Sequence, residues 1–475
     1  MNPPYRHHRY RHAAPLLAAA LAMALHVLPA AAQNAPLPVP ASGVIGMQDA
    51  YLTPEFWIHR QQAPDAILLP RSTINARNTR LLQQDPSMHN IAAFPATLSR
   101  AKVEAWITNL AAPPSKPLWD EASKPISKTT LDAVMANRAL AAIPATQPTR
   151  YGLAIHRTDQ RAFPTSFRVF STQGETDIDR FQESALFPGD AVVIAHTSRD
   201  GKWLFVVSER YAAWVETSTI AEGTRDAVLG YATRLPYRVI TGAKPSTVFT
   251  REQPQLSELQ LDMGTRVPLA SAAPDQPVNG QHPYTAWIVD LPLRGTNGKL
   301  QFAPALLPRI ADSSADYLPL THSTIVRQAF KFLGERYGWG HSYNARDCSG
   351  FVSDVYRSMG VQMPRNTSAQ AVSPAFKRTA FTANSSRAER MAAVAALDVG
   401  DLIYIPGHVM MYIGTIDGQP WVIHDTNGGS YLGQDGKLHS MHLNGVSVTP
   451  LLPLRFNKTT DYVDRITNIV RVTQE

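Results

Sequence analysis

The chain has 475 residues and a single cysteine, Cys348, so no disulfide can form within it. A chain of this length is too long for one hydrophobic core, and without cross-links several separate cores have to hold it. Hydrophobic residues make up 44% of the chain and charged residues 17%, a balance that favours folded domains over disorder. Several globular domains are therefore expected.

The first residues have the pattern of a secretory signal peptide. Arg6, Arg9 and Arg11 precede an apolar, alanine-rich stretch, and Pro29-Ala30-Ala31-Ala32 follows it. A retained membrane anchor is the alternative, but the apolar stretch is short and interrupted. Residues 1–32 are thus predicted to be a signal peptide, and no cysteine lies nearby to carry a lipid. The mature protein is expected to be periplasmic or secreted, without a membrane segment.

The charge excludes one class of partner. The formal charge of +7 falls to +4 once the three arginines of the signal peptide are removed. No basic cluster or aromatic motif accompanies this mild bias, so nucleic-acid binding is not expected. A weakly cationic surface suits an anionic polymer such as a cell wall.

Helical patterns come first in the mature chain. Residues 33–46 are rich in proline and alanine and predict a linker. Within 47–150, the apolar spacing of 98–110 and 129–143 predicts two helices, which Ala111-Ala112-Pro113-Pro114 separates. A helical, loop-rich N-terminal domain is predicted.

Short apolar runs replace the helical spacing from Tyr151 onward. The runs 191–195 and 203–207, with Asp200-Gly201 before the second, predict a β-hairpin. Another short strand follows, so residues 151–221 are predicted to form a small all-β barrel. A looser copy of the same pattern over 222–310 predicts a second barrel.

The last part of the chain, 318–475, predicts an α+β domain. A helix over 324–334 leads to Tyr337-Gly338-Trp339-Gly340, and a second apolar period of 3.6 runs from Cys348 to Gly360. Three short strands are predicted after it, at 402–405, 409–413 and 421–423. Cys348 is therefore expected at the N-terminal end of a helix.

That position gives the thiol a chemical role. Helix N-termini stabilise a thiolate, so Cys348 is a candidate nucleophile and not merely a small buried residue. His408 follows a turn and is the candidate base, forming an ion pair with the thiolate. His424 ends the next strand, where antiparallel pairing brings it beside His408 to orient the imidazole. Asp425 and Asn427 are alternatives for this third role.

These residues resemble the NlpC/P60 bacterial cell-wall cysteine peptidases, whose catalytic domain is papain-like. The two predicted barrels resemble the SH3b domains of multidomain members, and the N-terminal domain resembles their stabilising domain. The resemblance rests on five motifs in the family's order, which are Tyr337-Gly338-Trp339-Gly340, Asp347-Cys348-Ser349-Gly350-Phe351-Val352, Gly400-Asp401-Leu402, His408-Val409-Met410-Met411-Tyr412-Ile413-Gly414 and Val422-Ile423-His424.

The resemblance implies an endopeptidase that cleaves the bond between γ-D-glutamate and a diamino acid, meso-diaminopimelate, in peptidoglycan stem peptides or released muropeptides. Cys348 would be the nucleophile, His408 the general base and acid, and His424 the orienting residue. The resemblance also assigns substrate-binding or oxyanion roles to Tyr337, Trp339, Asp347 and Ser349, with the Cys348 N–H as a further oxyanion donor.

Two features of the resemblance concern access to the site. Glu183 and Tyr211 of the first barrel are implied to cap the substrate cleft, although aromatic residues of a small barrel more often form its core. His341 departs from the family, which usually has glycine at this position, so the loop and its subsites are expected to be reshaped.

Papain-like chemistry needs no cofactor, and none is expected. No metal site is predicted, because the irregular spacing of the late histidines, His424, His439 and His442, matches no familiar ligand pattern, and the early ones, His7, His8 and His12, fall in the signal peptide. Two other functions remain open. One is an amidase or acyltransferase with the same triad, and the other is a catalytically silent scaffold that binds peptidoglycan.

Overall fold

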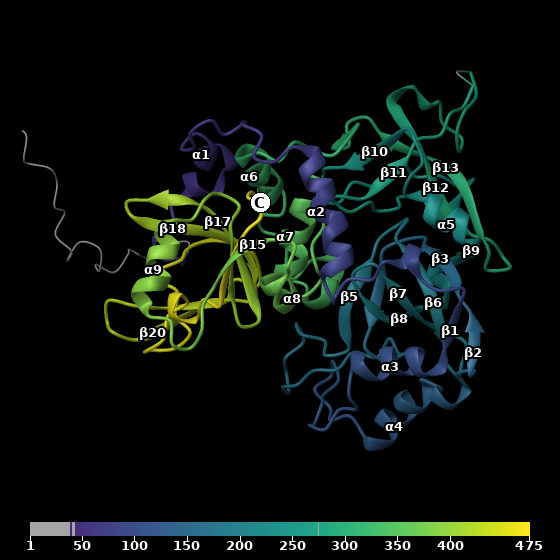
Figure 1. Ribbon diagram of the computed structural model, residues 1–475, viewed down its shortest axis with the longest axis horizontal. Coiled ribbons are helices and arrows are strands. Elements are labelled where there is room, and N and C mark those ends of the chain that lie inside the picture. Colours follow the sequence, from purple (N-terminus) through teal and green to yellow (C-terminus); the bar gives the residue numbers. More distant parts are fainter. Residues whose placement is uncertain (1–38, 40–42, 274) are drawn as a thin grey trace, which may run out of the picture.

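The computed structural model describes residues 39, 43–273 and 275–475, so the predicted signal peptide lies outside the described residues. A C-terminal α+β domain occupies one side of the molecule, and two β-rich regions occupy the other (Figure 1). Helix α2 runs between these two sides. None of the helices within the described ranges is long and apolar enough to span a membrane.

The C-terminal domain is a six-stranded antiparallel sheet with helices packed on it. The strand order is β15-β22-β16-β17-β18-β21, and α7 packs on β17 and β18. The helices are α6 (His322–Phe330), α7 (Cys348–Arg357), α8 (Thr367–Val372) and α9 (Arg387–Ala395). The strands are β15 (Lys377–Ala380), β16 (Leu402–Ile405), β17 (His408–Ile416), β18 (Gln419–Thr426), β21 (Gly445–Pro450) and β22 (Asn468–Arg471), with a separate hairpin of β19 (Gly429–Leu432) and β20 (Leu438–Met441).

The first β-rich region is one seven-stranded antiparallel sheet, in the order β5-β4-β8-β7-β6-β3-β9. Its apolar residues alternate between two buried faces, since one set packs with the N-terminal helices and another forms a second cluster. The strands are β3 (Arg150–Ala154), β4 (Thr158–Arg161), β5 (Gln182–Leu186), β6 (Ala191–Thr197), β7 (Trp203–Ser208), β8 (Ala212–Glu216) and β9 (Ile220–Gly223).

The second β-rich region has a different strand arrangement. It contains a three-stranded sheet, β11-β10-β14, and a long hairpin of β12 and β13 in register over nine residue pairs. A short helix, α5 (Arg225–Tyr231), which the apolar pattern did not predict, precedes it. The strands are β10 (Tyr237–Ile240), β11 (Arg266–Pro268), β12 (Ala286–Arg294), β13 (Leu300–Pro308) and β14 (Ser313–Ser314).

The N-terminal part of the described chain contributes to two cores. Trp57, Ile74 and Leu81 pack into the core of the C-terminal domain, whereas Val103 and Ile107 pack against the seven-stranded sheet. Its elements are α1 (Pro54–Ile58), α2 (Arg71–Gln84), α3 (Arg100–Leu110) and α4 (Lys128–Asn137), with a two-stranded sheet of β1 (Thr97–Ser99) and β2 (Thr146–Pro148). The segment thus joins the C-terminal domain to the first β-rich region.

Candidate active site

Cys348 is the first residue of α7, as predicted. The side chain of Asp347 caps this helix by accepting a hydrogen bond of 2.8 Å from the Gly350 N–H. The thiol is buried, and burial, followed by the charge of Asp347, raises the pKa of Cys348 to about 12. A hydrogen bond from the Val409 backbone and the charge of Arg365 act in the opposite direction. The helix position was predicted correctly, but the pKa of the thiol is raised and not lowered, because desolvation is the largest effect on it.

His408 begins β17, directly before the Val409 backbone group that contacts the thiol. Its Nε2 lies 2.8 Å from Nδ1 of His424, and Nε2 of His424 lies 2.9 Å from the Thr449 hydroxyl. Burial lowers the pKa of His408 to about 4 and lowers that of His424 as well. Both imidazoles are therefore neutral in the resting protein at pH 7.

Two assignments of protons satisfy this chain of contacts, because the Thr449 hydroxyl can accept or donate, and one of them leaves Nδ1 of His408 free to accept a proton. With the proton of His408 on Nε2, that N–H donates to Nδ1 of His424, whose own Nε2–H donates to Thr449. Nδ1 of His408 is then left with its lone pair. This is the arrangement that a general base needs.

The sheet explains why these three side chains meet. Tyr412 pairs with Val422 between β17 and β18, and Val422 pairs with Thr449 between β18 and β21. His408 and His424 each lie an even number of residues from these pairs, so they share one face of the sheet with Thr449. The sequence analysis missed Thr449, because the pairing of β21 with β18 is not readable from local patterns.

The two alternatives to His424 lie elsewhere. Asp425 points to the other face of β18, and within the described part of the chain its buried carboxylate oxygens have no hydrogen-bond partner. Burial raises its pKa well above the usual range. The Asn427 amide lies 3.5 Å from Asn444. Among the three candidates, His424 is the one bonded to His408.

The loop after α6 carries the tyrosine motif. Tyr337 is buried, and burial together with the Cys348 and Asp347 charges raises its pKa. The Trp339 indole N–H donates to the Gln182 carbonyl at 3.0 Å, and the Gln182 amide donates to the Gly340 carbonyl at 2.8 Å. Trp339, which the resemblance placed at the substrate, is thus used in a contact with β5.

Asp347 and Ser349 flank Cys348 and both bind Arg365, a residue that the sequence analysis did not single out. The Arg365 guanidinium lies 2.7 Å from Asp347 Oδ2 and 2.9 Å from the Ser349 hydroxyl. Arg365 lies well beyond the Asp347-Cys348-Ser349-Gly350 motif, and no local sequence pattern connects it to Cys348.

Glu183 and Tyr211 meet in the first β-rich region. The Tyr211 hydroxyl donates to Glu183 Oε2 at 2.6 Å. Burial raises the pKa of Glu183, while Tyr211 and the positive charge of Arg365 lower it. Arg365 also donates to the Glu183 backbone carbonyl at 3.2 Å, so this pair lies where Arg365 joins β5 to the start of α7.

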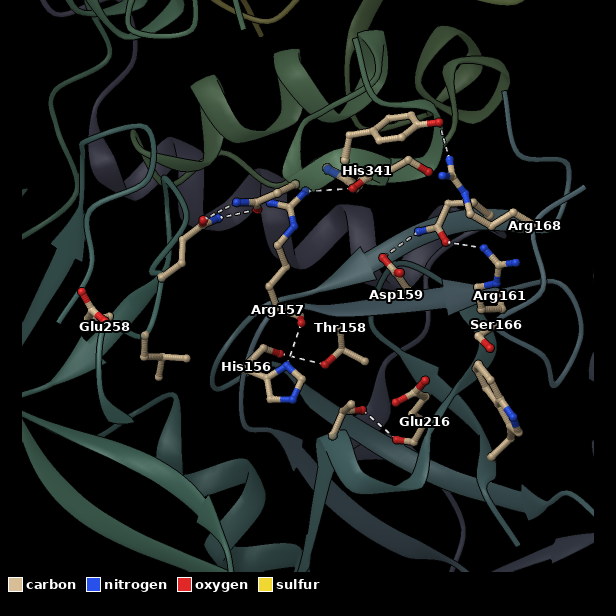
Figure 2. Close-up of a pocket in the computed structure, with 18 of the residues that line it drawn as sticks. His156, Arg157, Thr158, Asp159, Arg161, Ser166, Arg168, Glu216, Glu258 and His341 are labelled. Atoms are coloured by element: carbon tan, nitrogen blue, oxygen red, sulfur yellow. Dashed lines mark hydrogen bonds between the residues drawn. The ribbon is translucent and has the colours of Figure 1, made fainter. Parts of the chain in front are cut away.

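His341 adopts a left-handed conformation with φ of 68°, in a loop where Tyr343 and Asn344 do the same. Its imidazole is buried beside Gly350 and Phe187, and neither ring nitrogen has a partner among the described residues. Figure 2 shows Arg157 directed at this loop, where it donates to the His341 carbonyl at 3.1 Å. His341 therefore occupies a position whose backbone conformation favours glycine. Contacts from the β-rich regions hold the loop in this conformation.

A cavity of about 690 Å³ lies beside this loop (Figure 2). Its lining comes from both β-rich regions and from 341–344. The cations at its wall are already paired, Arg157 with Asp262 and Arg161 with Asp179.

No group of three or more metal-ligating side chains lies together in the part of the chain that the structure describes. Both ring nitrogens of His424 are used by His408 and Thr449, and His439 lies 3.0 Å from Asp435.

Comparison with known proteins agrees with this architecture. Residues 334–458 match the NlpC/P60 family, and residues 167–216 match the SH3 domain of the SH3b1 type. An NlpC/P60 endopeptidase from Photobacterium damselae subsp. piscicida has the same fold over 93% of this chain and 99% of its own, with a TM-score of 0.71 and 16% identity. An NlpC/P60 family protein from Bacillus cereus ATCC 10987 covers 68% of this chain and 99% of its own, at 19% identity and a TM-score of 0.46. No curated protein sequence matches the chain.

The predicted multidomain α+β architecture is thereby confirmed, with one SH3-type match. The second SH3-like domain, over 222–310, stays a prediction. The chain thus carries an NlpC/P60 domain, the cysteine-peptidase domain of cell-wall hydrolases, behind an SH3 domain of the SH3b1 type.

Proposed function

We propose that the protein is exported and cleaves the bond between γ-D-glutamate and the diamino acid of peptidoglycan stem peptides. The thiol proton of Cys348 passes to Nδ1 of His408 as the sulfur attacks the γ-glutamyl carbonyl carbon. The imidazolium then gives that proton to the departing amine, which leaves a thioester on Cys348. Water, deprotonated by His408, hydrolyses the thioester and regenerates the thiol.

Coupled proton transfer suits a buried pair. Ionising either the thiol or the imidazole alone is opposed by burial, since the pKa of Cys348 is raised and that of His408 is lowered. Passing one proton between them as the carbonyl is attacked keeps the net charge of the pair unchanged. In the tautomer of His408 that this step requires, its Nε2–H donates to His424, whose own Nε2–H donates to Thr449.

The carboxylate of Glu183 is the observation that carries the substrate proposal. It lies half-buried beside Tyr211, on the strand that Arg365 joins to the turn around Cys348. A carboxylate in this position favours a cationic group on the substrate, such as the free N-terminal amine of L-alanine in a released muropeptide. Tyr337 and the Cys348 N–H are proposed to stabilise the oxyanion.

The acyl group on Cys348 tests this proposal. Mass spectrometry of the protein quenched during turnover of a muropeptide is expected to show L-Ala-γ-D-Glu joined to the peptide that contains Cys348. An acyl group without D-glutamate would indicate an amidase or acyltransferase instead. A protein that acquires no acyl group from any stem peptide, yet binds peptidoglycan, would support the silent scaffold.

Export has its own test. N-terminal sequencing of the protein recovered from its native cells is expected to begin near Gln33, after cleavage at Ala32. A chain that still begins at Met1 and stays in the cytoplasm would contradict this part of the proposal.

A further inference from the structure

Arg365 uses every donor of its guanidinium group. Its side chain is 3% exposed. The five hydrogen bonds are Nε to the Ser184 hydroxyl at 2.7 Å, Nη1 to Asp347 Oδ1 at 3.2 Å and to the Ser349 hydroxyl at 2.9 Å, and Nη2 to Asp347 Oδ2 at 2.7 Å and to the Glu183 carbonyl at 3.2 Å. A guanidinium has five N–H groups, so none is left for a substrate.

The acceptors of these bonds belong to two segments that are far apart in the sequence. Asp347 and Ser349 flank the nucleophile at the start of α7, and Glu183 and Ser184 lie on β5 of the first β-rich region. Gln182, the residue before Glu183, bonds to Trp339 and Gly340 of the tyrosine loop. Strand β5 is thus bonded to that loop at Gln182 and to Arg365 at Glu183 and Ser184.

We propose that Arg365 is a positioning residue that fixes β5, with Glu183, against the turn that carries Cys348, and so sets the selectivity for substrates with a free amine. This inference rests on the proposed function. The distance between the amine-binding carboxylate and the nucleophile determines which carbonyl of a bound peptide meets the sulfur. A rigid, fully bonded fork keeps that distance constant between two domains.

Arg365 also acts on the charges around the thiol. It pairs with the buried Asp347, whose charge raises the pKa of Cys348, and its own charge lowers that pKa. A lysine keeps the charge but lacks the planar fork, so it can pair with Asp347 without spanning both segments. Substitution can therefore separate the effect of the positive charge at position 365 from the effect of joining β5 to the start of α7.

The experiment compares four variants of the full mature chain. Arg365→Gln removes both the charge and the contacts that join β5 to the start of α7, whereas Arg365→Lys keeps the charge. Ser184→Ala removes only the hydrogen bond between Arg365 and the Ser184 hydroxyl on β5. Arg390→Gln is the matched control, because Arg390 is similarly buried but bonds to backbone carbonyls of Thr382 and Ile466, away from the site. For each, kcat and KM are measured on muropeptides with a free or an acetylated N-terminal alanine, and thermal melting reports folding.

If Arg365 holds β5 against the start of α7, weakening these contacts should lower the selectivity for free-amine substrates. Arg365→Lys and Ser184→Ala are expected to lower the preference for the free amine, as a ratio of kcat/KM values, by roughly tenfold or more for lysine and by less for alanine. This loss is expected mainly as a higher KM for the free-amine substrate. Arg390→Gln is expected to lower the melting temperature without changing the ratio. A wild-type ratio in Arg365→Lys, or an equal change in Arg390→Gln, would overturn the inference.

A second readout does not depend on peptidase activity. The rate of Cys348 alkylation by iodoacetamide at pH 8 is expected to fall roughly tenfold in Arg365→Gln, to recover largely in Arg365→Lys, and to stay unchanged in Arg390→Gln. If the wild-type protein cleaves neither muropeptide, the proposed function fails, and this measurement still tests the action of Arg365 on the thiol. Equal alkylation rates in Arg365→Gln and the wild type would overturn it.

Discussion

Nε2 of the buried His424 lies 2.9 Å from the hydroxyl of Thr449, on the neighbouring strand of the sheet. This contact ends the chain of hydrogen bonds that begins at His408. In the tautomer that a general base needs, Thr449 accepts the Nε2–H of His424, so its hydroxyl stabilises that tautomer of His424 and, through it, that of His408.

Thr449→Val is therefore expected to slow catalysis while preserving the shape of the core. Valine fills the same space but accepts no hydrogen bond, so in the tautomer that catalysis needs it leaves the buried Nε2–H of His424 unsatisfied, at a cost of about 1–3 kcal/mol. We expect kcat to fall by roughly tenfold or more, with KM little changed. Thr449→Ser keeps the hydroxyl and is the control. Equal kcat values for the valine and serine variants would show that the contact has no role.

Stability is expected to fall in acid because of the buried histidines of the candidate site. The pKa of His408 is about 4 in the folded protein and about 6.5 in the unfolded chain, so the unfolded chain binds more protons between these values. The stability that depends on this group is complete above about pH 6.5 and is lost as the pH falls toward 4. Denaturation followed at several pH values measures this, with His408→Gln expected to show a weaker dependence. The exposed His442→Gln should keep the wild-type dependence.

The thiol is expected to react slowly at neutral pH. Because burial raises the pKa of Cys348 to about 12, the rate of alkylation should continue to rise with pH above 8. The rate of iodoacetamide modification, measured from pH 5 to 10, tests this. A plateau reached below pH 7 would show that the thiolate–imidazolium pair expected from the helix position is present at rest.

The buried carboxylate of Asp262 is expected to hold the second β-rich region to the catalytic domain. It lies 2.8 Å from Arg346 and 2.5 Å from Arg157, and Arg346 also pairs with Asp354. Asp262→Ala leaves two buried cations without this partner, and a loss of about 3–5 kcal/mol in unfolding free energy is expected. The exposed pair of Asp312 and Lys331 is the comparison, since Asp312→Ala should cost no more than about 1 kcal/mol. Similar losses in both variants would contradict the assigned role of Asp262.

The sequence predicted local features of the site but few of its long-range contacts. The helix at Cys348 and the strands that begin at His408 and end near His424 follow from apolar periodicity and turn residues, and all are present. Thr449 and Arg365 were missed, because each reaches the site through tertiary packing and has no distinctive local pattern. The direction of the Cys348 pKa shift was missed for the same reason, since desolvation depends on every neighbour of the thiol.

In the N-terminal segment as well, the sequence predicted the helices but not the surfaces against which they pack. Its helices were predicted close to α3 and α4, although the second ends earlier than expected, at Asn137. Amphipathic spacing indicates that a helix has a buried face but does not identify what covers it. Trp57 packs with Trp421 of the catalytic sheet, whereas Val103 packs with the other core, so one predicted domain is divided between two.

Digestion of purified muropeptides by the mature protein and by its Cys348→Ala variant tests the central claim most directly. Mass spectrometry is expected to show cleavage between D-glutamate and meso-diaminopimelate by the wild type, faster for a free than for a blocked N-terminal alanine, and no cleavage by the variant. Cleavage that persists in Cys348→Ala, or a wild-type protein that leaves every muropeptide intact, would contradict the account.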